Sequence, residues 1–374
     1  MKEVWKKKKI GDFLVLEYGK PLDKSKRKED GLFPAYGANG VKCWSDEFYF
    51  DQKTIIVGRK GSAGEITLTK DKFWPLDVTY FVKFDESKYN LMFIYYLLSR
   101  LDLPSLATGI KPGINRNNVY AIEVYVPVLP EQKRIVTILD QAFTDIEQTR
   151  AKTEQNLKNA RELFESYLQQ VFSQRSEGWV TTTLGQSCEF SNGKAHEKEI
   201  DEDGPFIVVN SKFISREGAV IKRTNKLLHP LYKNEIAMVM SDVPKGKALA
   251  KCFIVSENDK YTLNQRICSI RTDKFATRFL YYQLNRNPYL LAFDNKGSQA
   301  NLRKDDILFC PLHLPPIDEQ YYIANKLDDI LFKTRELESV YNNKLKSIDE
   351  LKKSILQKAF TGELTSNKSK GAAA

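Results

Sequence analysis

The chain has 374 residues, a formal net charge of +10 and 42% hydrophobic residues. This length allows two or three domains with real cores, and the basic balance favours a polyanionic partner such as nucleic acid. The five cysteines form no CxxC pair and the three histidines lie far apart, which argues against a structural zinc site. The longest apolar run, residues 91–98, is too short to cross a bilayer, and no apolar signal segment opens the chain, so we expect a cytoplasmic protein.

Residues 1–129 are predicted to form a mixed domain of helices and strands. Short apolar runs alternate with glycine-containing turns, and one helix is expected at residues 91–99. The expected strands are residues 13–16, 54–57, 65–69, 78–84 and 122–126. Lysine-rich runs at residues 6–9 and 24–28 flank the first strand, and they suit either phosphate contact or a plain solvated surface.

Two loops of this first block combine glycines with side chains of the types that read DNA. Residues 36–40 are YGANG and residues 58–64 are GRKGSAG. Glycine permits close backbone approach, arginine and lysine suit guanine or phosphate, and asparagine suits adenine. Both loops also fit ordinary tight turns, and neither is a P-loop, because the closing lysine and hydroxyl residue are missing. The candidate DNA contacts here are Tyr36, Asn39, Arg59, Lys60, Ser62 and Lys111.

Residues 130–173 predict one helix of roughly 40 residues, about 60 Å long. Apolar and small residues recur at alternating spacings of four and three, the period of a coiled-coil seam. Two successive steps of four at Thr149, Thr153 and Leu157 predict a stutter that locally unwinds the supercoil. A helix this long with a narrow apolar stripe needs a partner to cover that stripe. The predicted seam includes Ile135, Leu139, Ile146, Leu157 and Phe164.

Residues 174–315 predict a second mixed domain that shares the plan of the first but has different loops. A helix is expected at residues 279–284. The expected strands are residues 206–209, 236–240, 248–255 and 267–270. Where the first block has GRKGSAG, this one has SDVPKGK at residues 241–247, and it adds TLNQR at residues 262–266. The candidate DNA contacts here are Lys194, Asn210, Ser241, Lys245, Lys247, Gln265 and Arg266.

Residues 316–364 predict a second long helix, followed by a low-complexity tail, residues 365–374, that we expect to be disordered. Adding 188 to the seam positions of the first helix reproduces the apolar stripe and the stutter, now at Leu337, Tyr341 and Leu345. Because both helices share this irregularity at the same register, we predict that they pack along each other. The predicted seam includes Ile323, Leu327, Ile330, Leu345, Ile348 and Ile355.

The chain is therefore interpreted as an internal duplication, with each half a globular block followed by a long helix. The approach to each helix is repeated, since residues 109–119 match residues 297–307 and Glu131-Gln132 match Glu319-Gln320. The halves also open alike, with Trp5, Gly11 and Gly19 matching Trp179, Gly185 and Gly193 at an offset of 174. The predicted fold class is α+β, two similar domains separated by two long helices that pair as an antiparallel coiled coil.

Known catalytic patterns find little support in the sequence. Asn287-Pro-Tyr289 lacks one proline of the Asn-Pro-Pro-Tyr loop of amino-methyltransferases and is interpreted as a helix-ending turn. Glu86 and Lys88 after Asp77 have the order of a nuclease site, and residues 201–203 (DED) are a possible metal cluster, but chance spacing and a solvated loop explain them in a chain that is 28% charged. We expect no catalytic residue, no metal and no cofactor in this chain.

The duplicated plan, the Pro-x-x-x-Glu-Gln entry into each helix and the ending SILQKAFTGELT at residues 354–365 resemble the specificity subunit of a Type I restriction-modification system. The resemblance covers the chain up to Thr365. It departs at the first helix, which ends YLQQVFS without the TGEL sequence, so any contact made by that sequence is expected only in the second copy.

The resemblance implies two target recognition domains, each reading one half of a split double-stranded DNA target. It also implies two methyltransferase subunits docked on this chain, together with endonuclease/translocase subunits that join the complex. S-adenosylmethionine, ATP and magnesium would bind those other subunits, and this chain would be non-catalytic. Half-sites about one DNA turn apart, ~34 to 36 Å, suit a pseudo-two-fold reader, so removing one turn from both helices is expected to change the spacer.

Two other classes of protein stay open from the residues alone. A self-contained restriction or modification enzyme requires its own methyltransferase or nuclease motifs. A purely structural coiled-coil protein accounts for the long helices but not for the duplicated basic domains.

Overall fold

The chain forms two compact units in the computed structural model, which describes residues 5–173, 177–243, 247–294 and 300–365. Unit 1 contains residues 1–155 and 341–374, and unit 2 contains residues 156–340. Each unit therefore combines one globular domain with part of each long helix. Among the described residues, none of the helices is both long enough and apolar enough to cross a membrane.

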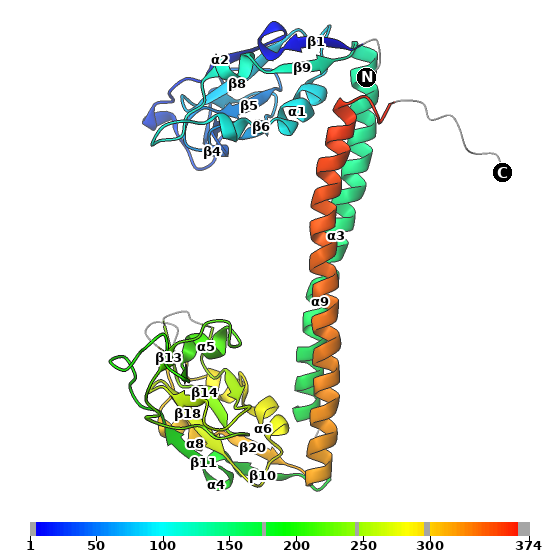
Figure 1. The fold of residues 1–374 in the computed structure, drawn as a ribbon. Coiled ribbons are helices and arrows are strands. Elements are labelled where there is room, and N and C mark those ends of the chain that lie inside the picture. Colours follow the sequence, from blue (N-terminus) through cyan, green and yellow to red (C-terminus); the bar gives the residue numbers. More distant parts are fainter. Residues whose placement is uncertain (1–4, 174–176, 244–246, 295–299, 366–374) are drawn as a thin grey trace, which may run out of the picture. The chain divides into compact units, whose positions relative to one another are not determined.

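The globular domain of unit 1 is built from three small sheets and short helices (Figure 1). A four-stranded antiparallel sheet has the order β2 (Leu14–Tyr18), β8 (Thr79–Phe84), β5 (Ile55–Gly58) and β6 (Ile66–Leu68). A three-stranded sheet has the order β4 (Gly40–Ser45), β3 (Phe33–Gly37) and β7 (Trp74–Pro75), and β1 (Lys6–Lys9) pairs with β9 (Glu123–Val126). The helices are α1 (Leu91–Arg100) and α2 (Arg116–Tyr120), with 3-10 turns at Ile10–Asp12, Lys24–Lys26 and Leu103–Leu106.

Helix α1 connects this domain to the long helices. The Asn90 side chain accepts a hydrogen bond from the Phe93 backbone amide, which caps the helix N-terminus. Phe93, Ile94 and Leu97 are fully buried, and they share one core with Ile135 and Leu139 of the first long helix, α3 (Leu129–Ser173). The Phe93 ring also packs on Phe360 of the second long helix, α9 (Ile317–Phe360), with ring centroids 5.2 Å apart.

Unit 2 has the same topology. Its four-stranded antiparallel sheet is β11 (Glu189–Asn192), β18 (Ile267–Arg271), β14 (Ile236–Val239) and β16 (Cys252–Ile254), and its three-stranded sheet is β13 (Arg223–Thr224), β12 (Phe206–Val209) and β17 (Tyr261–Leu263). Two further pairs are β10 (Val180–Thr183) with β20 (Pro311–Leu314), and β15 (Ser241–Asp242) with β19 (Ala300–Asn301). The helices are α4 (Leu184–Ser187), α5 (Ser211–Ser215), α6 (Thr277–Leu284), α7 (Pro288–Leu291) and α8 (Lys304–Leu308). Phe279 of α6 packs on Phe172 of α3 at 5.6 Å, as Phe93 packs on Phe360.

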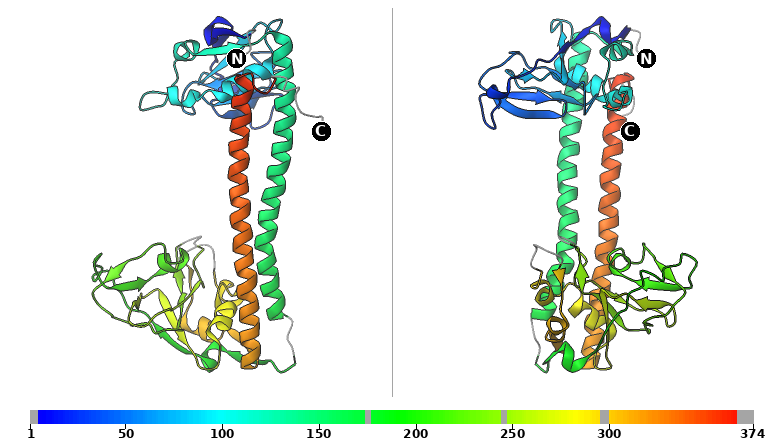
Figure 2. Two further views of the ribbon diagram at one scale, coloured as in Figure 1. Left: turned by 45° about the vertical axis from the view of Figure 1, so that its right-hand side comes forward. Right: turned by 90° about the vertical axis from the view of Figure 1, so that its left-hand side faces the viewer.

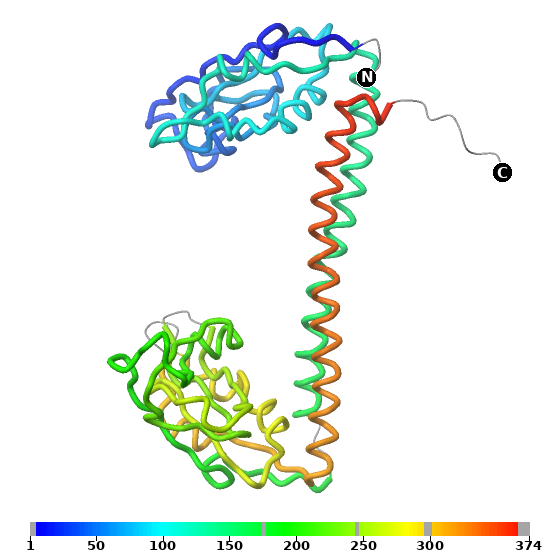
Figure 3. Tube along the Cα trace, in the orientation of Figure 1, coloured from blue at the N-terminus to red at the C-terminus, as the bar shows by residue number. Residues whose placement is uncertain are grey.

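The helices α3 and α9 lie side by side and antiparallel in each unit (Figures 2 and 3). In unit 1, Lys352 pairs with Glu147 at 2.7 Å and Arg150 pairs with Asp349. The residue numbers of the partners fall along α9 as they rise along α3, so the two helices are antiparallel. In unit 2, Arg161 donates from Nε to Glu338 at 2.9 Å. The offset of 188 residues relates Arg150 to Glu338 and Arg161 to Asp349. The repeat therefore turns one ion pair into the other, with arginine and carboxylate exchanged between the two helices.

The residues of the predicted seam form a covered stripe, but the stutter lies one heptad earlier in each helix than predicted. Thr149 is exposed and Leu337 is 39% exposed, so neither lies in the seam. Arg150 and Glu338 are partly covered instead, so the two successive steps of four fall at Ala142, Ile146 and Arg150 and at Ile330, Thr334 and Glu338. Long charged side chains can cover apolar surface with their methylene stems while the charges pair across the helices. All of the seam residues named from sequence are buried or half-buried: Ile135, Leu139, Ile146, Leu157, Phe164, Ile323, Leu327, Ile330, Leu345, Ile348 and Ile355.

A buried glutamine fixes each domain to the start of its helix. The Gln132 side chain accepts from the Asn90 amide and donates to the carbonyls of Lys88 and Pro127. The Gln320 side chain makes the three equivalent bonds, to Ala276, Lys274 and Pro315. The repeated Glu-Gln motif therefore has a structural role in both copies.

A fourth hydrogen bond in each attachment uses a tyrosine. Tyr96 of α1 donates to Asp140 of α3, and Tyr282 of α6 donates to Asp328 of α9. Burial and the neighbouring carboxylate raise the pKa of both tyrosines, so both hydroxyls stay protonated as donors at neutral pH.

The predicted α+β class and the two long helices are confirmed, with several local differences. The long helices run over Leu129–Ser173 and Ile317–Phe360, close to the predicted 130–173 and 316–364. Strands β3 and β4 were not predicted, and the predicted strand 248–255 is reduced to Cys252–Ile254 because Ala250 adopts a positive φ of 55°. Thr365 is buried and so is not part of a disordered tail, whereas residues 366–374 lie outside the described residues. Gly362 of the TGEL sequence has a φ of +79° and lies against Trp5.

Candidate nucleic-acid interface

Three loops of unit 1 meet beyond the end of strand β5. The Arg59 backbone carbonyl accepts from the Ile114 amide at 3.0 Å, and the Gly61 amide donates to the Pro112 carbonyl at 3.0 Å. These bonds join the loop 59–64 to the loop 108–114. The β3–β4 turn lies beside them, because a side chain at Gly58 would come within 2.8 Å of the Ala38 carbonyl. Glycine at position 58 is therefore required for the close approach of the three loops.

The structure brings most of the unit 1 candidates together on these loops. Asn39, Lys60 and Lys111 are exposed, and Arg59 and Ser62 are half-buried. Tyr36 is the exception, since it is only 4% exposed and packs edge-to-face on Phe73 in the core. Its hydroxyl accepts from the Lys70 amide at 3.2 Å. The prediction that Tyr36 contacts DNA is wrong for this structure, because both faces of strand β3 are covered at this point and the ring packs into the core.

Two residues that the sequence did not single out join Arg59. Tyr18, at the end of β2, is 44% exposed, and the guanidinium carbon of Arg59 lies 5.4 Å from its ring centroid. Arg116, the first residue of α2, lies 4.9 Å from the same centroid. The three side chains come from segments 41 and 57 residues apart (59 − 18 and 116 − 59), so no local pattern connects them.

In unit 2, backbone hydrogen bonds at equivalent positions join the loops as they do in unit 1. The Leu302 amide donates to the Met240 carbonyl at 2.8 Å, as Ile114 donates to Arg59. The Met240 amide donates to the Arg266 carbonyl at 3.0 Å, as the Arg59 amide donates to the Val78 carbonyl at 2.9 Å.

Two further bonds complete the shared frame. The Lys194 amide donates to the Leu263 carbonyl, as Lys20 donates to Pro75. The Asn264 amide donates to the Val209 carbonyl, as Leu76 donates to Tyr36. We call the set of four paired bonds the loop frame.

The loop frame places the unit 2 candidates on neighbouring segments, with different degrees of exposure. Lys194, Lys247, Gln265 and Arg266 are exposed, and Gln265 donates to Glu197 at 3.2 Å. Asn210 uses its side-chain oxygen to cap α5 by accepting from the Phe213 amide. Ser241 is half-buried and pairs with Asn301, which the sequence did not single out. Lys245 lies outside the described residues.

The histidines beside the unit 2 loops are structural. His196 is fully buried, with Nδ1 2.7 Å from the Lys194 carbonyl and Nε2 2.9 Å from the Thr262 hydroxyl. Burial lowers the pKa of His229, and the nearby Lys194 and His196 lower it further. His229 is therefore neutral at pH 7, and the loop end owes its positive charge to lysine and arginine. In the described ranges, three or more histidine, cysteine, aspartate or glutamate side chains never gather closely enough to hold a metal.

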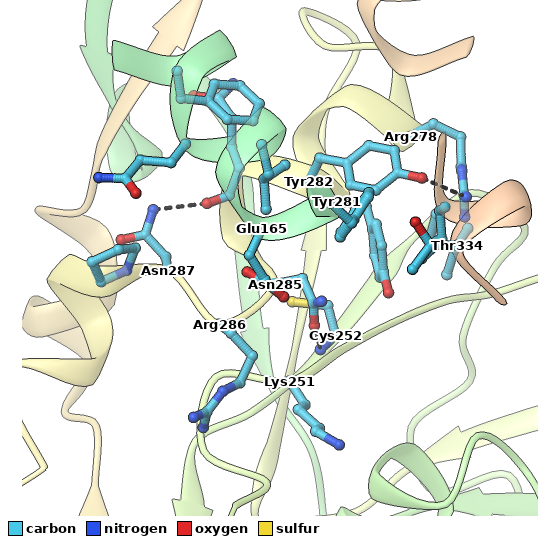
Figure 4. Close-up of a pocket in the computed structure, with 18 of the residues that line it drawn as sticks. Glu165, Lys251, Cys252, Arg278, Tyr281, Tyr282, Asn285, Arg286, Asn287 and Thr334 are labelled. Atoms are coloured by element: carbon cyan, nitrogen blue, oxygen red, sulfur yellow. Dashed lines mark hydrogen bonds between the residues drawn. The ribbon is translucent and has the colours of Figure 1, made fainter. Parts of the chain in front are cut away.

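A separate cavity of about 1140 Å³ lies in unit 2 between the domain and the long helices (Figure 4). Its wall includes Arg278, which donates to the Tyr282 hydroxyl at 3.2 Å, and Asn287, which caps α7 and donates to the Gln283 carbonyl. Asn287 therefore begins a short helix that contains Pro288 and Tyr289, and the prediction of a helix-ending turn is wrong for these two residues. Cys252 also lines the cavity, and burial raises the pKa of its thiol well above the usual value, so it is not a thiolate nucleophile at neutral pH.

Comparison with known proteins identifies the relatives of this chain. The family model described as the Type I restriction modification DNA specificity domain matches residues 2–158 and 176–347. The chain is 24% identical over 404 residues to the Type I restriction enzyme EcoDI specificity subunit of Escherichia coli, covering 96% of this chain and 89% of that protein. It is 26% identical over 290 residues to the StySPI specificity subunit of Salmonella potsdam, covering 69% and 62%.

Solved structures share the fold. A chain from a structure that describes complex assembly and conformational transition of the type I R-M system matches with a TM-score of 0.77 and 15% identity, covering 96% of this chain and 98% of that one. The HsdS subunit from Thermoanaerobacter tengcongensis matches with a TM-score of 0.61 and 16% identity, covering 97% and 98%.

Proposed function

The chain belongs to the Type I restriction-modification DNA specificity family, and we propose that each of its two domains reads one half of a bipartite target in double-stranded DNA. The protein acts as the specificity subunit of a Type I restriction-modification system. Family membership favours this function over a self-contained restriction enzyme or a structural coiled coil. The observation that carries the proposal is the loop frame, which both units share while its side chains differ.

The loop frame suits readers of two different sequences for a physical reason. Its bonds join backbone amides to backbone carbonyls, so they do not depend on which side chains the loops present. Exposed side chains on such loops can vary without loss of the fold. Arginine, lysine, asparagine and glutamine are the residue types that read bases or hold phosphates. Matching backbone hydrogen bonds in the loops of the two units, combined with different side chains, therefore support recognition of two different half-sites.

The proposed partners are the methyltransferase and endonuclease/translocase subunits of the complex, with two methyltransferase subunits per specificity subunit. In unit 2, Tyr321, Tyr322, Phe332 and Val340 of α9 are more than half exposed, at 57%, 67%, 61% and 58%. Several large aromatic and aliphatic side chains exposed on one helix are typical of a protein–protein interaction surface. We assign them to methyltransferase docking. The chain itself contributes recognition and no catalytic step.

A methylome comparison tests the proposed function. Cells with and without this gene are compared for methylated adenines and cytosines across the genome, with the partner genes kept intact. A methylated motif made of two short specific parts separated by a fixed unread spacer should disappear when the gene is removed. Loss of a single continuous motif, or no loss at all, would contradict two half-site readers.

A further inference from the structure

We infer that Tyr18 is a positioning residue for DNA recognition, holding Arg59 and Arg116 as an ordered pair that contacts the first half-site. The inference rests on the proposed function and deepens it for one domain. The cluster of Tyr18, Arg59 and Arg116 is called the arginine–tyrosine cluster below.

Tyr18 lies in the four-stranded sheet of the unit 1 domain. It is the last residue of β2 and pairs with Tyr80 of the adjacent strand β8. The two rings lie edge to face with centroids 5.1 Å apart, and Tyr80 is only 3% exposed. Contact with Tyr80 therefore orients the ring of Tyr18, while Tyr18 is 44% exposed and can contact other groups. A strand position orients a side chain more accurately than a loop does.

Backbone carbonyls orient both arginines beside this ring. The Asp77 carbonyl accepts from Nε and Nη2 of Arg59, at 3.1 and 2.6 Å. The Leu16 carbonyl accepts from Nη1 of Arg116 at 3.4 Å. These bonds use two of the five N–H donors of Arg59 and one of the five of Arg116. The other donors suit guanine or phosphate, and the ring face stabilises each cation by about 0.5 to 1 kcal/mol at an exposed site.

Two cations that share one ring favour an anionic or acceptor-rich ligand. Both guanidinium carbons lie within 5.4 Å of the Tyr18 ring centroid, so the two positive charges repel each other, and this repulsion falls when a phosphate or the O6 and N7 atoms of guanine accept hydrogen bonds from both arginines. Lys60 and Lys111 extend the positive charge on adjacent loops, where Lys60 forms a β-bridge with Gly113. DNA of the first half-site is the ligand that this arrangement fits.

Unit 2 lacks the cluster at the same places in the frame. Asn192 occupies the position of Tyr18, since it pairs with Cys268 as Tyr18 pairs with Tyr80. Met240 occupies the position of Arg59 in the loop frame, and Lys304 begins α8 as Arg116 begins α2. At these three positions the second domain therefore has one cation where the first has two cations and a ring, and that cation, Lys304, lies 5.9 Å from the ring centroid of Phe190 instead. An effect of Tyr18 should be confined to the first half-site.

Two substitutions at Tyr18 in the full-length chain, assembled with its methyltransferase, test the inference. Tyr18→Phe keeps the ring and should keep the base preferences. Tyr18→Leu removes the ring and should lower the preference at one or more positions of the first half-site by about 5- to 150-fold, the range expected for a lost base contact. The measurement is selection of bound duplexes from a library randomised in both half-sites. Asn192→Leu is the matched control and should leave the first half-site unchanged.

A double-substitution cycle separates positioning from a general loss of folding. If Tyr18 acts through Arg59, then Arg59→Ala should change the first half-site preference much less in the Tyr18→Leu background than in the unchanged chain. Additive effects, an unchanged preference with Tyr18→Leu, or an equal loss with Tyr18→Phe would each overturn the inference. The second half-site reports on the proposed function separately. If the unchanged complex shows no preference in either half, the proposed function fails instead.

Discussion

In unit 1 the residue that follows strand β5 is Arg59, whereas the residue that follows the equivalent strand β14 in unit 2 is Met240. Both residues use their backbone amide and carbonyl in the same two hydrogen bonds of the loop frame. The Arg59 side chain lies over the ring of Tyr18. Met240 carries no charge, and Asn192 takes the place of Tyr18 in unit 2. The comparison teaches that the fold conserves the backbone positions of the loops and leaves the chemistry of their side chains free.

The attachment of each domain shows the opposite behaviour. Gln132 and Gln320 make the same three side-chain hydrogen bonds, and both residues are almost fully buried. A buried amide side chain must satisfy both donors and acceptor, so few other residues fit that position. Variation is therefore tolerated at the loop end of each domain and restricted at the helix end.

The largest expected effect comes from shortening both long helices together, which tests whether the two units act as a pair. A coiled-coil heptad has seven residues, so deleting residues 147–153 and 346–352 removes one heptad from each helix, together with both partners of the interhelical pairs Arg150–Asp349 and Lys352–Glu147. The helices become about 10 Å shorter, or about three base pairs at 3.4 Å per step. We expect the preferred spacer to shorten and the original target to lose specific binding, measured by selection from a library with variable spacers.

The control for this deletion removes residues 147–153 alone. This variant loses the register between α3 and α9 and should unfold at a lower temperature or fail to fold. A stably folded double deletion that still prefers the original spacer would show that helix length does not determine spacing.

The next effect concerns the two attachment glutamines. Gln132→Ala and Gln320→Ala should each lower the free energy of unfolding by about 3 kcal/mol, because each removes three buried hydrogen bonds at roughly 1 kcal/mol apiece. Equal losses at the two sites would show that the units are attached alike. The measurement is chemical unfolding of the full chain, with the exposed Gln148→Ala of α3 as the control, expected within ~0.5 kcal/mol of the unchanged protein.

Single base-reading substitutions should then separate the two units functionally. Arg59→Ala should weaken binding by about 1 to 3 kcal/mol and relax preference in the first half-site only, and Arg266→Ala should do so in the second half-site only. If either arginine contacts phosphate alone, binding will weaken evenly over all sequences and the salt slope will fall by about one. Relaxation of both half-sites by one substitution would contradict separate readers.

The smallest expected effect compares two threonines of the seam. The buried Thr153 of unit 1 donates from its hydroxyl to the Thr149 carbonyl at 2.7 Å. The hydroxyl of the buried Thr334 of unit 2 has no hydrogen-bond partner among the described residues. Thr334→Val should therefore stabilise the protein by about 1 kcal/mol, whereas Thr153→Val should be neutral or slightly destabilising. Thermal unfolding measures both, and an equal shift for the two variants would contradict this explanation.

The sequence by itself determined the duplication, the two long helices and the family. These features are periodic or repeated, so they are visible in local spacing, such as the stripe from Ile135 to Phe164 and the Glu-Gln motif 188 residues apart. The sequence also placed Asn39, Lys60 and Arg266 on exposed loops, because glycine and polar residues mark turns.

Only the tertiary structure decided which side chains act together. Tyr36 lies in a glycine-rich segment that suggested a loop, yet strand pairing turns it into the core. Arg150 and Glu338 replace Thr149 and Leu337 in the seam because each finds an opposite charge on the other helix. Tyr18, Arg59 and Arg116 meet because β2 and β5 end, and α2 begins, at one edge of the domain. Contacts of this kind depend on long-range packing, which the spacing of residues along the chain does not encode locally.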